Sequence, residues 1–129
     1  MPPSDPRQYF PPPGEPGRFP FSSAVLAGNT LYLSGHIGVD LAANKVPEDV
    51  KDEIRLMMDG FQQTILNSGF SMNELVYVQI FCSDVALFST FNGVYRIYFS
   101  EPFPARAFLG SGPLLFGAHF EIQGIAVRK

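Results

Sequence analysis

Arg106 has the most unusual setting of any charged residue in this sequence. It is the only charge in an apolar segment, with residues 104–105 before it and residues 107–109 after it. A guanidinium removed from water needs an anionic partner, and its planar fork binds a carboxylate through two parallel hydrogen bonds. The partner is either a carboxylate of this chain or one of a substrate, and the residues alone leave both open.

Glu121 is the second candidate, because it lies in a segment that alternates between apolar and polar side chains. Phe120 and Ile122 point to one face of a predicted strand over residues 118–127, whereas His119, Glu121 and Gln123 point to the other. Such a polar face is more often a solvated outer surface. The alternative is the polar wall of a cleft, in which Glu121 acts as a general acid and base or positions a water molecule.

The other reactive side chains predict no metal or nucleotide site. His36 and His119 are the only histidines, and neither has a second ligand at metal-binding spacing. Cys82 is the only cysteine and lies within an apolar run, so we expect an inert core thiol. Gly110-Ser111-Gly112 lacks the third glycine of a dinucleotide-binding loop, and no Gly-Lys-Ser/Thr occurs.

The elements that must position these residues begin with a hairpin and a long helix. Residues 24–27 and 30–34 are β-prone and flank Gly28-Asn29, which is typical of a two-residue turn. Apolar residues then recur every three or four positions from Val50 to Ile65, which predicts a helix. Pro47 suits its first turn, and Gly69 suits its end.

The second half of the chain predicts three further strands and a second helix. Residues 75–82 form a nearly continuous apolar run, as in a strand covered on both faces, after a one-turn capping box at 71–74. Asp84 suits the N-cap of a helix over roughly 85–98, and strands follow at 105–109 and 118–127. An optional strand before the first helix completes an α+β sandwich, a mixed six-stranded sheet with both helices on one face.

Composition sets the limits on the class of protein. A chain of 129 residues and 14.2 kDa has the size of one domain, and its net charge of −3 gives no basic surface for nucleic acid. With neither a signal-peptide layout nor a membrane-spanning run, the sequence predicts a cytoplasmic protein. Thirteen Phe and five Tyr are many rings for so small a domain, which favours a homo-oligomer. Residues 1–20 contain eight prolines and predict an extended arm without a packed element, followed by a domain over 21–129.

Five segments, in order and at consistent spacing, resemble one known family. They are Phe-Ser-Ser-Ala-Val (21–25), Leu-Tyr-Leu-Ser-Gly-His-Ile-Gly (31–38), the spaced residues from Asp84 to Phe99, Phe-Pro-Ala-Arg (103–106) and Gly-Ala-His-Phe-Glu-Ile (117–122). Together they resemble the Rid (reactive intermediate deaminase) family, also called the YjgF or L-PSP endoribonuclease-like family. The resemblance implies a chorismate-mutase-like fold and a homotrimer, whose sheets form a central barrel with ligand clefts between neighbouring subunits.

The resemblance also implies an activity: hydrolysis of 2-imino acids such as 2-iminobutanoate and 2-iminopropanoate to 2-oxo acids and ammonia, without metal or organic cofactor. It implies that Arg106 binds the substrate carboxylate and that Glu121 positions the attacking water. Ser34 and Gly35 would line the pocket, and Asn92 matches an asparagine of the family's second helix.

The chain departs from the family at two further pocket positions, where Phe21 replaces a tyrosine and Phe108 replaces a cysteine. Because neither ring carries a polar atom, we expect a pocket that disfavours polar substrate side chains. These departures leave open a non-catalytic trimer that binds small carboxylates. Endoribonuclease activity, which one family name suggests, is a third possibility that the acidic net charge disfavours.

Overall fold

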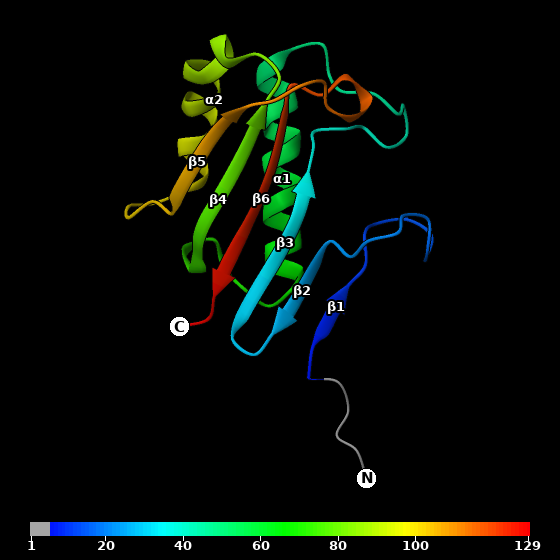
Figure 1. The fold of residues 1–129 in the computed structure, drawn as a ribbon, viewed down its shortest axis with the longest axis vertical. Coiled ribbons are helices and arrows are strands. Elements are labelled where there is room, and N and C mark those ends of the chain that lie inside the picture. The colour runs from blue at the N-terminus through cyan, green and yellow to red at the C-terminus, as the bar shows by residue number, and fades with distance from the viewer. Residues whose placement is uncertain (1–5) are drawn as a thin grey trace.

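The computed structural model describes residues 6–129, in which one mixed sheet is packed against two helices (Figure 1). The strands stand in the order β1-β2-β3-β6-β4-β5, and only β4 and β5 run parallel. Their bounds are Gln8–Phe10, Ala24–Ala27, Thr30–His36, Leu75–Cys82, Ala105–Gly110 and Phe120–Val127 for β1 to β6. Helices α1 (Val50–Asn67) and α2 (Phe88–Tyr95) lie on the same face of the sheet (Figure 1). The predicted α+β class and the mixed six-stranded sheet are confirmed.

Helix α1 begins and ends where local capping chemistry allows. The Asp49 carboxylate accepts hydrogen bonds from the backbone N–H groups of Lys51 and Asp52, at 2.8 and 3.2 Å, and so caps the helix. Pro47 therefore lies before the cap, and its predicted place in the first turn is wrong. Gly69 follows the C-cap with a φ of +81°, as predicted for a residue that ends a helix in the left-handed region.

Short 3-10 helices complete the connections: η1 (Met72–Glu74), η2 (Val85–Leu87), η3 (Arg96–Tyr98) and η4 (Leu115–Gly117). The predicted capping box at Ser71 and Glu74 is present and opens η1. The Asp84 carboxylate accepts a hydrogen bond from Ala86 N at 3.1 Å, so it caps η2 and not α2 itself. The helical segment thus starts as a 3-10 turn that continues into α2.

The sixth strand lies in the proline-rich segment and not before α1. Gln8–Phe10 pairs antiparallel with β2, and the Ser23 N–H donates to Phe10 O at 2.7 Å. The expectation that this segment has no packed element is therefore wrong for β1, although residues 1–5 of the predicted arm lie outside the described residues. Between β3 and α1 the described chain forms only the isolated bridge between Asp40 and Lys45, so the optional strand is not formed there.

The two faces of the sheet differ sharply in burial. In β4, Val78, Ile80 and Cys82 are fully buried against the helices, whereas Val76 is 46% exposed. No element of residues 6–129 covers the second face, because both helices lie on the first. The expectation that β4 is covered on both faces is wrong for a single chain. Within the same residues, no helix is long and apolar enough to cross a membrane.

Glu53 in α1 is a fully buried carboxylate held by His119. One carboxylate oxygen lies 2.7 Å from the His119 backbone N, and the other lies 2.7 Å from its Nδ1. His119 precedes β6 and its ring faces α1, so the predicted placement of His119 on one polar face with Glu121 is wrong. The pair fastens the start of β6 to α1.

We expect Glu53→Ala to lower the free energy of unfolding by about 2–4 kcal/mol, because it leaves the His119 backbone N–H without its partner and opens a cavity. Urea unfolding would measure the change, with the exposed Glu48→Ala as the control. A Glu53→Ala midpoint equal to that of the control would contradict a structural role for this pair.

Candidate active site

The side chain of Arg106 points to the helix-covered face of the sheet. Arg106 pairs with the fully buried Val78 in the parallel β4–β5 ladder, and paired residues of neighbouring strands share a face. Its guanidinium carbon lies between 4.9 and 5.9 Å from the ring centroids of Phe88, Phe91, Tyr95 and Phe108. Such distances allow cation–π attraction.

No carboxylate of the described chain forms an ion pair with Arg106. Of the two partners that the sequence left open, the internal one is therefore not used within residues 6–129. The aromatic rings hold the guanidinium in place without neutralising its charge. Its hydrogen-bonding fork thus stays available for an external anion.

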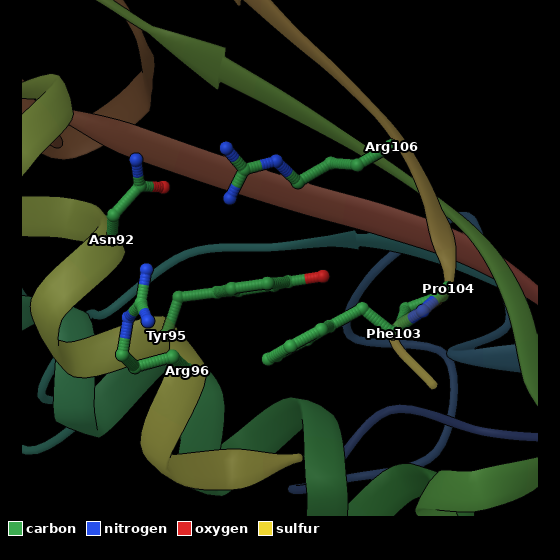
Figure 2. Close-up of a pocket in the computed structure, with 6 residues that line it drawn as sticks. All are labelled: Asn92, Tyr95, Arg96, Phe103, Pro104 and Arg106. Carbon is green, nitrogen blue, oxygen red and sulfur yellow. The ribbon is translucent and has the colours of Figure 1, made fainter. Parts of the chain in front are cut away.

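A hollow of about 190 Å³ opens beside this guanidinium (Figure 2). Pockets for drug-sized ligands span roughly 300–1,000 Å³, so this one suits a small metabolite. It is lined by two residues of α2, one of η3, two of the loop before β5 and one of β5: Asn92, Tyr95, Arg96, Phe103, Pro104 and Arg106.

Two polar atoms at the hollow are buried without a hydrogen-bond partner in the described chain. They are Oδ1 of Asn92 and the hydroxyl of Tyr95. Burial raises the pKa of Tyr95 to about 12, although the nearby Arg106 opposes the rise, so the phenol keeps its proton at neutral pH. Buried polar groups normally have partners, and a bound ligand would supply them here.

Phe108 does not line the hollow but supports it. Its ring meets those of Phe88 and Phe91, with centroids 4.9 and 5.4 Å apart. All three rings lie within cation–π range of Arg106. Phe108 therefore sets the position of the guanidinium instead of contacting a ligand in this hollow.

Glu121 lies on the opposite, open face of the sheet. It pairs with Phe81 of β4. The neighbouring Ile80 is buried on the helix-covered face, so Phe81 and Glu121 point to the other face. Its carboxylate lies against Gly35 of β3, where an added Cβ would overlap Oε2 of Glu121. The register of β3 and β6 shifts between Leu33 and His36, which brings this glycine to the carboxylate. Burial raises the pKa of Glu121, so it takes up a proton more readily than an ordinary glutamate.

Ser34 and Phe21 belong to the same end of the sheet as Glu121. The Ser34 hydroxyl and backbone N–H both donate to Ser23 O, each at 3.0 Å. Phe21 precedes Ser23 by two residues, is half exposed, and stacks with Phe19 at a centroid separation of 5.6 Å. The Ser34 contact ties β3 to the segment before β2.

The predicted site residues thus form two groups on opposite faces. The first group is Arg106 with Asn92 and Phe108; the second is Glu121 with Gly35 and Ser34. Phe21 stacks with Phe19 in the segment before β2 and is assigned to neither group. Within one chain the sheet separates the two groups, so one small ligand does not reach both Arg106 and Glu121.

Sequence reasoning missed four residues of the hollow: Tyr95, Arg96, Phe103 and Pro104. A signal for the first two was present, because Asn92, Tyr95 and Arg96 are three and four positions apart and therefore share one helix face. Tyr95 also lies on the apolar stripe of this helix, and at 4% exposure it belongs to the core as well as to the hollow. Nothing in the pattern distinguished Arg96 from a solvated surface charge.

The remaining candidates have structural roles. His36 places Nδ1 2.7 Å from Ser34 O and Nε2 2.9 Å from Thr64 Oγ1, and burial lowers its pKa. Cys82 is buried with its Sγ 3.0 Å from Asp84 O, and burial raises the pKa of this thiol. Across residues 6–129 no three His, Cys, Asp or Glu side chains gather as a metal site would require.

Comparisons with known proteins match most of the chain. The family model described as Endoribonuclease L-PSP matches residues 15–128. A protein of Dermatophagoides farinae named 2-iminobutanoate/2-iminopropanoate deaminase is 37% identical over 109 residues, which cover 84% of this chain and 85% of that protein.

Two crystal structures show the same architecture. YyfA of the Rid protein family from Yersinia pestis superposes with a TM-score of 0.84 at 27% identity, covering 94% of this chain and 98% of that one. Escherichia coli TdcF with bound serine superposes with a TM-score of 0.80 at 29% identity, covering 86% and 90%. The chain therefore belongs to the Endoribonuclease L-PSP family, which is the Rid family that its sequence motifs resemble.

Proposed function

We propose that the protein is a deaminase that hydrolyses small 2-imino acids to 2-oxo acids and ammonia. The observation that carries this proposal is a guanidinium with no carboxylate partner in residues 6–129, beside a hollow with two unpartnered polar atoms. The name of the Dermatophagoides farinae relative and the serine bound to TdcF both support a ligand with a carboxylate and a nitrogen on the next carbon.

In this proposal the fork of Arg106 binds the substrate carboxylate and Asn92 accepts a hydrogen bond from the imine N–H through its free Oδ1. Glu121 takes a proton from a water molecule while the oxygen of that water forms a bond to the imine carbon. That proton passes to the imine nitrogen, which gives a carbinolamine with a hydroxyl and an amine on the same carbon. Glu121 then transfers the hydroxyl proton to the amine, so that the C=O bond forms as the C–N bond breaks and ammonia leaves a 2-oxo acid. Positioning of water and imine supplies the remaining acceleration.

This chemistry requires a second copy of the chain, because Arg106 and Glu121 lie on opposite faces of one sheet. We propose a homotrimer in which the Arg106 group of one subunit meets the Glu121 group of its neighbour. The uncovered sheet face supports such an assembly, since it exposes large apolar side chains: Tyr32, Val76 and Leu109 are 51%, 46% and 41% exposed. A stable monomer in light scattering at micromolar concentration would contradict the shared site.

Mixed subunits test the shared site directly. Co-expression of Arg106→Lys and Glu121→Gln chains with two different tags, followed by tandem purification, gives trimers that contain both variants. In each such ring one of three clefts regains both native residues, so we expect about one third of wild-type deaminase activity. Two differently tagged Arg106→Lys chains, purified in the same way, serve as the control and should show only the residual activity of that variant.

The outcome separates the candidate functions. No recovery in mixed trimers would contradict a site shared between subunits. A wild type that binds 2-oxobutanoate but releases no ammonia from enzymatically generated 2-iminobutanoate would favour a carboxylate-binding trimer. RNA cleavage that is lost in Arg106→Lys would favour the endoribonuclease.

A further inference from the structure

The hollow beside Arg106 contains a second guanidinium, that of Arg96. Arg96 begins η3, one helical turn after Asn92, and is exposed. In Figure 2 the guanidinium ends of Arg96 and Arg106 both extend toward Asn92. The two cations approach from different elements, since Arg106 belongs to β5 and Arg96 follows α2.

The charge in this hollow is unbalanced. Its six lining residues include two arginines and no carboxylate. Neither arginine forms an ion pair within residues 6–129. Like charges in one small pocket repel each other, and this pair stands out in a chain whose net charge is −3. A ligand with two negative charges would relieve the repulsion, whereas a ligand with one would neutralise only one guanidinium.

The two phenylalanines singled out from the sequence do not line this hollow. Phe108 lies against the guanidinium of Arg106 and outside the hollow, and Phe21 lies in the segment before β2. The expectation of a pocket that disfavours polar substrate side chains depended on these two phenylalanines. That expectation did not include Arg96. With Arg96 in the hollow, we expect a preference for a negatively charged substrate side chain instead.

We propose that this hollow selects 2-imino acids and 2-oxo acids with a second carboxylate on the side chain, with the first carboxylate on Arg106 and the second on Arg96. The inference rests on the proposed function and specifies its substrate class. Arg106, which is half-buried among aromatic rings, binds the carboxylate common to all these ligands, whereas the exposed Arg96 binds the carboxylate of the side chain.

Two ligands of similar length test the proposal in the full-length protein. Calorimetry would compare 2-oxoglutarate with 2-oxohexanoate, which has an ethyl group in place of the second carboxylate. Because Arg96 is exposed, we expect about fivefold tighter binding of 2-oxoglutarate at low ionic strength. Arg96→Gln should lose that preference and keep its affinity for 2-oxohexanoate.

Arg55→Gln is the matched control, since it removes the same charge from the exposed face of α1. It should keep the preference for 2-oxoglutarate, which added salt should weaken. A wild type that binds 2-oxohexanoate as tightly as 2-oxoglutarate overturns the inference alone, and so does an Arg96→Gln variant that keeps the preference. A wild type that binds 2-oxobutanoate but neither longer ligand also overturns the inference alone, whereas one that binds none of the three 2-oxo acids overturns the proposed function and the inference with it.

Discussion

Glu121→Gln is expected to lower the turnover of 2-iminobutanoate by about 100- to 10,000-fold, the usual contribution of a general acid and base. Glutamine keeps the size of the side chain and still hydrogen-bonds a water molecule, but it cannot take a proton from it. Affinity for 2-oxobutanoate, measured by calorimetry, should stay near that of the wild type, because the proposed contact with the carboxylate is made by Arg106 and not by Glu121. Glu48→Gln, an exposed change before α1, is the control for the loss of one negative charge.

The pH profile gives a second readout of Glu121. Proton abstraction needs the ionised carboxylate, so the rate should fall as the pH falls through the pKa of Glu121. Because burial raises that pKa, the acid limb should lie above the ordinary range of glutamate. The limb should be absent from the residual activity of Glu121→Gln. A variant with wild-type turnover and an unchanged limb would remove Glu121 from the mechanism.

Arg106→Lys is expected to lower kcat/KM by roughly thirty- to two-hundredfold, equivalent to about 2–3 kcal/mol of transition-state stabilisation. Four aromatic rings, whose centroids lie 4.9 to 5.9 Å from the guanidinium carbon of Arg106, orient this planar group. An ammonium keeps the charge but loses the two-point fork that fixes the imine carbon. Unlike Glu121→Gln, this change should also weaken 2-oxobutanoate binding.

Arg55→Lys provides the control for Arg106→Lys, because it makes the same substitution on the exposed face of α1. Steady-state kinetics of both variants, with thermal unfolding to verify folding, would separate a site effect from a general one. Wild-type kcat/KM and 2-oxobutanoate affinity in Arg106→Lys would refute its role as the carboxylate clamp.

Local signals in the sequence predicted the elements that carry their own signatures. The apolar spacing of α1 and the glycine at its end identified one helix, and the apolar run of residues 75–82 matched β4 residue for residue. The strand predicted at 105–109 is present and extends to Gly110. These elements could be predicted because capping and side-chain periodicity depend only on residues that are close together in the sequence.

β1 could not be predicted in this way, because its pairing depends on the backbone. Gln8–Phe10 lies between prolines and exposes Tyr9, so it has no alternating pattern to detect. Its hydrogen bonds reach β2, some fifteen residues farther along the chain, and three proline-free residues suffice to make them. Composition described the segment correctly as extended but said nothing of its partner.

The candidate site could also be predicted only in part. Residue types singled out Arg106 and Glu121, but their separation on opposite faces depends on how β5 and β6 pair with β4. A shift of register by one residue would move either side chain to the other face. Arg96 could not be predicted as a site residue, because the hollow that it lines forms only when α2 packs beside β5.

The contact between Gly35 and Glu121 limits which substitutions this lineage can accept. An alanine at position 35 would occupy the space of the Glu121 carboxylate, so the side chain at 121 would have to swing away or become shorter. Substitutions at the two positions are therefore not independent, because the residue at 35 decides which conformations the side chain at 121 can adopt. A Gly35→Ala chain would keep the sheet, but its glutamate would no longer lie where the glycine now places it.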